Sequence, residues 1–212
     1  MLKIITPPAT SDLTTINVVK RDLDISTSRD DAYLCGLIQS CSWAAETFCR
    51  RSFGLTVYQE TFRRKYSGGC SMNGQTNLVL SRFPLVSISS IVEDDGPALT
   101  EGVDFDADSD GVVARLCNDR VRDWNSAKIV VEYSAGYLLP NDSGRTLPVD
   151  IERAVLLMVK AAYFSRTRDP LLKSQDVHGL EATSFGAVGL GPHNDLLPEA
   201  ESLLTPYRLP VI

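Results

Sequence analysis

The sequence predicts an α+β fold, in which a helical core carries an inserted antiparallel β subdomain and an extended C-terminal arm. Apolar residues recur at helical spacing within residues 1–54 and alternate with a period of two within residues 55–137. Helical spacing returns within residues 138–169, whereas residues 170–212 are rich in Gly and Pro. This order of helices, strands and helix indicates that the β-rich part is inserted into the helical part.

The N-terminal helical part is expected to contain a short and a long helix. Thr10 or Ser11 can cap the short one, because a side-chain hydroxyl accepts a hydrogen bond from a free N–H group of the first turn. The long helix is predicted over residues 30–51, with Ser28 as its cap and Gly54 beyond its end. Its apolar positions recur at helical spacing and are Leu34, Leu37, Ile38, Cys41, Ala45 and Phe48.

The β-rich part is expected to form a series of strands joined by turns. Apolar and polar residues alternate in each predicted strand, and pairs that contain Gly or Asp separate them. The predicted strands are residues 57–66, 77–80, 86–92, 103–107, 112–116 and 127–133. In the last of these, Ile129, Val131 and Tyr133 are predicted to share one face, because successive side chains of a strand point to opposite sides.

A third helix is predicted from residue 150 to about residue 165. Pro148 and Asp150 favour a helix start, because first-turn N–H groups have no intrahelical partner and the helix dipole is positive there. Apolar residues surround this helix almost completely, which is typical of a helix buried on more than one side. We expect another subunit to supply the second cover, with Leu156, Leu157 and Phe164 at the contact.

Composition and charge argue against several classes of function. The 212 residues carry a formal net charge of −6, which disfavours binding of nucleic acid through its phosphates. No apolar run approaches the roughly 20 residues that span a bilayer, and Pro7-Pro8 interrupt the N-terminal apolar run, so no membrane segment and no signal peptide are predicted. The five cysteines form no close pair and are predicted to be buried, reduced thiols rather than ligands of a metal.

Three segments could bind a ligand but have a simpler interpretation. Residues 106–111 (DADSDG) match the first half of a calcium-binding loop, yet its twelfth position is Cys117 rather than Glu, and a hairpin with an Asp-Gly turn is favoured. Residues 186–191 (GAVGLG) lack the Lys and Ser/Thr of a phosphate-binding loop. Residues 63–65 (RRK) could contact a DNA backbone, although a solvated strand face is favoured.

The sequence contains no recognised catalytic motif, and its only histidines are His178 and His193. General acid–base catalysis near neutral pH relies most often on histidine, so an enzyme is not expected and no cofactor is predicted. The alternative from a different class is a small enzyme or ligand-binding domain with a site in the β-rich part. That alternative predicts a functional role for Asp104, Asp106 or Cys70.

Several short segments occur in a characteristic order and spacing along most of the chain. They are residues 18–23, 30–34, 37–38, 44–46, 49–51, 82–91, 104–105, 111–113, 131–137, 147–151, 203–208 and the single residues Ala154, Tyr163 and Arg166. Together they resemble the head–tail connector (adaptor) proteins of tailed bacteriophages. The resemblance thins at residues 67–76 and 170–195.

The resemblance implies a structural virion protein without enzymatic activity. Such proteins form a ring, commonly of about twelve copies, below the portal at the capsid vertex, where they join head to tail and extend the DNA channel. The implied partners are other copies of the chain, the portal protein, and stopper or tail-terminator proteins. DNA is expected to pass through the lumen without specific binding. The implied location is the virion neck, after assembly in the host cytoplasm.

The C-terminal arm and the long helices are the expected partner contacts. A segment with little structure of its own is typical of an arm that becomes ordered when it docks. We expect deletion of residues 196–212 to abolish head joining and to leave a folded protein. The predicted interface residues are Leu156, Leu157, Phe164, Arg166, Leu196, Leu197, Leu203, Leu204, Tyr207 and Arg208. Within the same class, a stopper or tail-completion protein is the alternative.

Overall fold

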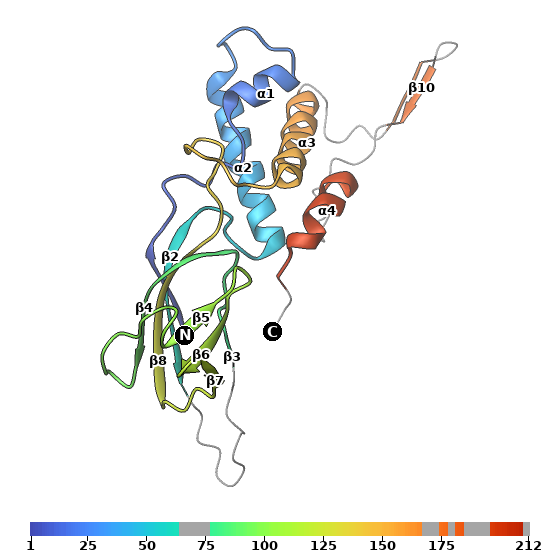
Figure 1. Cartoon of the computed structure of the whole chain (residues 1–212). Helices are drawn as coiled ribbons and strands as arrows, with labels where there is room; N and C mark the ends of the chain where they lie inside the picture. The colour runs from blue at the N-terminus through green and yellow to red at the C-terminus, as the bar shows by residue number, and fades with distance from the viewer. Residues whose placement is uncertain (64–76, 167–173, 178–180, 185–195, 210–212) are drawn as a thin grey trace. The chain divides into compact units, whose positions relative to one another are not determined.

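The computed structural model describes residues 1–63, 77–166, 174–177, 181–184 and 196–209 (Figure 1). The chain forms two compact units, each built from two separate stretches of sequence. The β unit comprises Met1–Ala9 and Gly54–Tyr137, and the helical unit comprises Thr10–Phe53 and Leu138–Ile212. Helices and antiparallel sheets together confirm the predicted α+β class.

The β unit contains two four-stranded antiparallel sheets. The first has the order β1-β2-β8-β4, with β1 at Leu2–Thr6, β2 at Thr56–Arg63, β8 at Lys128–Ala135 and β4 at Leu85–Glu93. The second has the order β3-β6-β5, with β3 at Asn77–Val79, β6 at Val112–Cys117 and β5 at Phe105–Ala107, and β7 at Arg120–Arg122 also pairs with β6. The strands predicted from alternation are therefore present, whereas β1 and β7 are additions to the prediction.

The core of the β unit is formed by side chains from both sheets. Ile129, Val131 and Tyr133 alternate with less buried residues along β8, which confirms their predicted common face. They pack in one cluster with residues of the second sheet such as Phe105 and Val113. Burial of this apolar surface is the main favourable contribution to the stability of the unit.

The helical unit contains α1 at Ile16–Asp22, α2 at Asp31–Cys49, α3 at Val149–Ser165 and α4 at Pro198–Leu204, followed by a 3-10 turn at Thr205–Tyr207. The bounds of α2 and α3 lie within two residues of the prediction, although Asp30 rather than Ser28 is the N-cap of α2. The cap of α1 does not, because Thr15 rather than Thr10 or Ser11 accepts the hydrogen bond from the N–H of Val18. Leu13, which follows both of the expected caps, lies buried just before the helix rather than in it.

The apolar surface of α3 is covered by helices of the same chain. Three helices pack against it, namely α1, α2 and α4. Val155 and Val159 are fully buried among them. The expectation that another subunit supplies the second cover is therefore wrong for most of α3, because α4, distant in sequence, lies on it. Within the described part of the chain, no helix is both long and apolar enough to cross a membrane.

The C-terminal arm contains two further structural elements before its final helix. Strands β9 at Ser174–Val177 and β10 at Glu181–Ser184 pair antiparallel and form a two-stranded sheet of their own. The register joins Ser174 to Ser184 and Val177 to Glu181. We call this element the β9–β10 hairpin.

Candidate interaction surfaces

One side of α2 is exposed along most of the helix and carries no charge. We call it the α2 outer face. Its exposed residues recur every three or four positions and are Ala32, Cys35, Gly36, Gln39, Ser40, Trp43 and Thr47. The surface of a solvated helix ordinarily carries charged side chains opposite its apolar stripe. The α2 outer face departs from that pattern and is typical of a covered helix.

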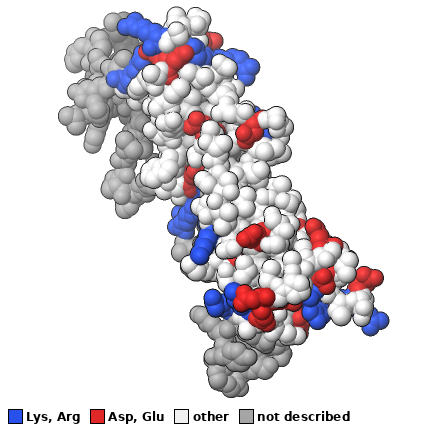
Figure 2. Space-filling view, turned by 90° about the vertical axis from the view of Figure 1, so that its left-hand side faces the viewer, with Lys and Arg blue, Asp and Glu red and all other residues white. Residues whose placement is uncertain are grey.

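Trp43 is the most conspicuous residue of the α2 outer face, because 69% of it is exposed. Tryptophan is enriched at the centres of protein interfaces, where its large apolar surface leaves water. A Cβ atom added at Gly36 would meet nothing within 4 Å, so the backbone there is open to close approach. Figure 2 shows one face of the chain, on which basic side chains gather at one end of the helical unit.

A second exposed cluster lies where the start of α2 meets the end of α3, and we call it the aromatic–arginine cluster. The Arg166 guanidinium lies 4.4 Å from the ring centroid of Tyr163 and 5.4 Å from that of Tyr33. The Tyr163 ring also packs edge-on against Phe164, at 5.7 Å between centroids. Phe164 itself is 61% exposed. Tyr, Phe and Arg are residues that interfaces favour.

Asp30 holds the aromatic–arginine cluster in place. Its Oδ2 accepts hydrogen bonds from the Tyr163 hydroxyl at 2.8 Å and from the Arg166 guanidinium at 3.2 Å. The bond from Arg166, and then that from Tyr163, hold the pKa of Asp30 below its ordinary value. The guanidinium is thereby fixed in one orientation, so that a partner would meet a preorganised surface.

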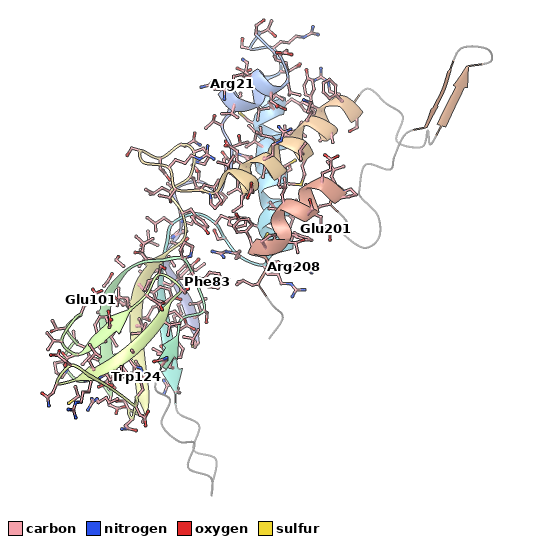
Figure 3. The ribbon with its side chains drawn as sticks, turned by 45° about the vertical axis from the view of Figure 1, so that its right-hand side comes forward. Arg21, Phe83, Glu101, Trp124, Glu201 and Arg208 are labelled. Atoms are coloured by element: carbon pink, nitrogen blue, oxygen red, sulfur yellow. The ribbon has the colours of Figure 1, made fainter. Side chains whose placement is uncertain are left out.

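The end of the C-terminal arm docks on its own helical unit. The N–H of Leu209 donates to the carbonyl of Cys49 at 3.0 Å, and the Tyr207 ring packs edge-on against Phe53 at 6.4 Å. The Arg208 guanidinium lies 4.9 Å from the Phe48 ring centroid. Figure 3 shows Glu201 on α4 and Arg208 just beyond its end. Residues 196–209 are therefore part of the helical unit, even though they are far in sequence from α2.

The predicted interface residues do not form one surface. Phe164 and Arg166 lie in the aromatic–arginine cluster, and Arg208 is exposed at the end of the arm. The leucines Leu156 and Leu204 are buried within the helical unit. Five others are partly buried: Leu157, Leu196, Leu197, Leu203 and Tyr207. Sequence reasoning missed Trp43, although its position off the apolar stripe of α2 is a signal that could have identified it.

The cysteines differ in exposure, which corrects part of the prediction. Cys41 and Cys49 are buried, and burial raises the pKa of each thiol to about 11. Cys35 and Cys117 are exposed, the first on the α2 outer face and the second in β6. Cys70 lies outside the described residues. The described residues contain no group of three or more His, Cys, Asp or Glu side chains that could hold a metal ion.

The acidic segment at residues 106–111 forms the predicted hairpin between β5 and β6. The Asp108 carboxylate accepts hydrogen bonds from the N–H groups of Asp110 and Val112, at 3.1 and 3.0 Å. Gly111 has a φ of +79°, the left-handed conformation that glycine adopts without strain. The carboxylate of Asp108 is thus used to stabilise the turn. Residues 186–191 lie outside the described part of the chain, as do Arg64 and Lys65.

Two buried polar clusters in the β unit were not predicted from the sequence. Glu60 accepts hydrogen bonds from the N–H of Ser81 and the hydroxyl of Tyr133, both at 3.0 Å, and from the hydroxyl of Ser81. Arg115 forms ion pairs with Glu93 at 3.3 Å and Asp104 at 3.4 Å. Each carboxylate has several partners within the unit. Because buried polar groups need such partners, these contacts account for the residues as structural.

The pKa of Asp104 is lowered mainly by the N–H of Thr100, which donates to its carboxylate, and further by Arg115. The pKa of Tyr133 is raised by burial and by the neighbouring Glu60 carboxylate. Asp104 is therefore stabilised as a carboxylate and Tyr133 as a neutral phenol. These pKa shifts follow from the structural hydrogen bonds, and neither shift makes its group a better acid or base near neutral pH.

Comparison with known proteins identifies a family model and solved structures that are similar to this chain. A family model described as head completion protein matches residues 12–187. A chain in the neck of an empty GTA particle, computed with C6 symmetry, is 16% identical, with a TM-score of 0.56 and coverage of 100% of this chain and 97% of that one.

Two further structures are similar to the chain at 15% identity, and each match covers 100% of this chain and 97% of the other. They are the virion of a native gene transfer agent (GTA) particle, with a TM-score of 0.55, and the neck of a native GTA particle computed with C12 symmetry, with a TM-score of 0.52. At these identities the likeness shows a common fold. No curated protein sequence matches the chain.

Proposed function

The chain belongs to the head completion protein family, and from this premise we propose that it forms a ring below the portal, which joins the phage head to the tail and extends the DNA channel. It is a structural protein of the head–tail neck. The similar chains come from neck structures computed with C6 and C12 symmetry, which supports a ring of about twelve copies.

The α2 outer face carries this proposal. A closed ring of identical copies needs two unlike surfaces on each copy, one for each neighbour. The cores of protein interfaces are depleted of charged residues and enriched in aromatic ones. The uncharged α2 outer face, with Trp43 exposed, has this composition. We assign it to the contact with a neighbouring copy.

The aromatic–arginine cluster is the second surface of the helical unit that suits a partner. It combines Tyr33, Tyr163, Phe164 and Arg166 with a fixed orientation of the guanidinium. The proposed partners are the portal protein on one side of the ring and stopper or tail-terminator proteins on the other. The predicted interface residues that are exposed, Phe164, Arg166 and Arg208, are available for these contacts.

The charge of the chain supports a channel that does not retain DNA. A formal net charge of −6 repels the phosphate backbone rather than attracting it. In the proposed ring every copy contributes the same net charge. DNA can therefore pass without being bound.

A stopper or tail-completion protein is the alternative within the same class. Such proteins tend to be smaller and dominated by β structure. The helical unit, with α2 and α3 of 19 and 17 residues, favours the ring-forming connector.

Substitution at the α2 outer face tests the proposal. Native mass spectrometry of the wild-type chain, alone and with its cognate portal, should reveal a ring of about twelve copies. This number corresponds to the C12 symmetry with which the neck of the native GTA particle was computed. Trp43→Asp should abolish the ring without changing the melting temperature, because the side chain is exposed. The matched control is Val103→Asp, at an exposed residue of the β unit. A wild-type chain that stays monomeric with its portal would contradict the proposal.

A further inference from the structure

Within the described residues, the first sheet of the β unit ends at β1, and this edge is open. The N-terminal amino group of Met1 donates to the carbonyl of Thr61 at 2.7 Å, and the Met1 carbonyl accepts from the N–H of Thr61 at 2.8 Å. In an antiparallel pair, such doubly bonded residues alternate with residues whose peptide groups point away. The N–H and C=O groups of Lys3 therefore point toward β2. The N–H and C=O groups of Leu2 and Ile4 point away from β2, outward from the sheet.

Among the described residues, the side chains of β1 give this edge little protection. Ile4 is 60% exposed and Ile5 is 53% exposed, although isoleucine is ordinarily buried. Lys3 is the single charged residue of the strand. Natural sheets protect their edges with charges, bulges or a covering segment, because an open apolar edge pairs readily with another strand. The β1 edge has little of this protection.

The opposite edge of the same sheet differs. Strand β4 pairs with β8 through two register irregularities, one between Leu85 and Ser87 and one between Ile88 and Ser90. Ile91 also accepts a hydrogen bond at 2.8 Å from the N–H of Leu99, in the segment that follows the strand. Strand β1 has one irregularity, between Ile4 and Thr6 at its end. Of the two edges, β1 is the one prepared to accept a strand.

The β9–β10 hairpin is the complementary feature. Among the described elements, β9 and β10 pack substantially on each other alone. A two-stranded hairpin by itself is at best marginally stable in water, so it gains from adding to another sheet. Residues 174–184 contain Asp176 and Glu181 but no Lys or Arg. This acidic hairpin suits a strand whose charge is Lys3.

We propose that the β9–β10 hairpin of one copy adds to the open edge of β1 in the next copy, so that neighbouring copies share a β-sheet. This proposal rests on the ring-forming function. The occupant is a second copy because the hairpin and the edge are unlike surfaces, one of each per chain, which is the condition for a closed ring. Pairing by backbone hydrogen bonds along an exposed edge is an established mode of protein association.

Two variants test each side of the contact. Ile4→Pro removes an N–H that points outward, and proline is tolerated at a sheet edge when no internal hydrogen bond is lost. The second variant replaces residues 174–184 by a Gly/Ser linker of equal length and leaves β1 unchanged. Each variant alone should raise the concentration at half-assembly about tenfold or more. Ile4→Ala, which retains the N–H, is the matched control and should assemble more nearly like the wild type.

Mixing the two variants gives the decisive result. The hairpin of the Ile4→Pro chain can pair with the intact β1 edge of the linker chain, but the reverse contact is blocked on both sides. Native mass spectrometry should therefore detect heterodimers at concentrations where each variant alone is monomeric. Absence of heterodimers would overturn the proposal, as would a cross-link between hairpin and β1 within one chain.

The outcomes separate this inference from the function on which it rests. Rings formed by both variants at the wild-type concentration would overturn the shared sheet and leave the ring-forming function intact. A wild-type chain that forms no ring, alone or with its portal, would overturn both. Circular dichroism melting of each variant confirms that its fold is retained.

Discussion

The two units of the chain differ in where their polar and aromatic side chains are used. In the β unit, Glu60 and Arg115 are buried and have partners within the unit. In the helical unit, Trp43 and Phe164 are exposed, and the core depends on α4 from the far end of the chain. The difference indicates that the helical unit presents surfaces for partners, and that its core is completed by a segment from the far end of the chain.

Deletion of residues 196–212 is expected to have the largest effect and to separate the two units. Ala200 and Leu204 are fully buried, so their loss exposes the core of the helical unit. We expect the amide signals of the helical unit to collapse in a two-dimensional NMR spectrum, while those of the β unit persist. The sequence alone predicts a folded protein after this deletion, but the burial of Ala200 and Leu204 indicates that the helical unit loses part of its core. A truncated chain with both sets of signals intact would contradict the role assigned to α4.

A single substitution measures the same contact more finely. Leu204→Ala should lower the free energy of unfolding by about 2–5 kcal/mol, because the cavity it leaves lies in a closed core. Leu203, its neighbour on α4, is only partly buried. Leu203→Ala is therefore the matched control, with a smaller expected loss. Equal losses for the two variants in urea unfolding would show that the packing of α4 is not specific.

Tyr133→Phe tests the internal hydrogen bonds of the β unit. The Tyr133 hydroxyl donates to Glu60 at 3.0 Å within the core. Its removal should lower the free energy of unfolding by about 1–3 kcal/mol, because a buried carboxylate loses one partner. Hydrogen exchange should accelerate in the β unit alone. Equal acceleration in the helical unit would show that this hydrogen bond does not stabilise the β unit alone.

The Asp30 carboxylate predicts a smaller, pH-dependent effect in the helical unit. Because its pKa in the folded state lies below the ordinary value of 3.8, it contributes stability above that pH. This contribution is lost as the pH falls through the lower, folded-state pKa. Asp30→Asn should therefore reduce the difference in stability between neutral and strongly acidic solution. An unchanged acid-unfolding profile would contradict the contact with Arg166 and Tyr163.

Thiol labelling distinguishes the two units without changing stability. Cys35 lies on the α2 outer face and Cys117 lies in the β unit, and both are exposed in the single chain. Both thiols should react with a maleimide in the monomer. Assembly of the ring should protect Cys35, because the proposed contact places a neighbouring copy over the α2 outer face. Cys35 that labels equally fast before and after assembly would place the subunit contact elsewhere.

Much of the fold could be predicted because it depends on local periodicity. The apolar stripe of Leu34, Ile38 and Ala45 locates α2, and the alternation of Val131 and Tyr133 locates β8. The relationship to phage head–tail proteins is also confirmed, by the family match. The segments that carry this resemblance are spread along most of the chain, and their order and spacing are characteristic.

The remaining features depend on contacts between distant residues. The end of α2 was predicted at residue 51, but Arg50 adopts a left-handed conformation with φ of 57° and ends the helix at Cys49. Strand β1 pairs with residues 57–60, far along the chain, and its own short sequence does not specify that partner. Strand β7 has Arg on both sides of Val121, so alternation of apolar residues was too brief to indicate it.

The surfaces were harder to predict than the elements for the same reason. Helical periodicity places Leu156 and Leu204 on apolar stripes, but it does not say whether the cover is another chain or the same one. In the structure the cover is the same chain. Exposure of Trp43 becomes evident once α1 and α3 are seen to pack elsewhere on α2.

Cryo-electron microscopy of the chain assembled on its cognate portal tests the central claim most directly. The account predicts a closed ring of about twelve copies, with Trp43 buried against a neighbouring copy. This number corresponds to the C12 symmetry of the neck of the native GTA particle. A single copy bound to the portal, or a ring in which the α2 outer face remains in solvent, would contradict it.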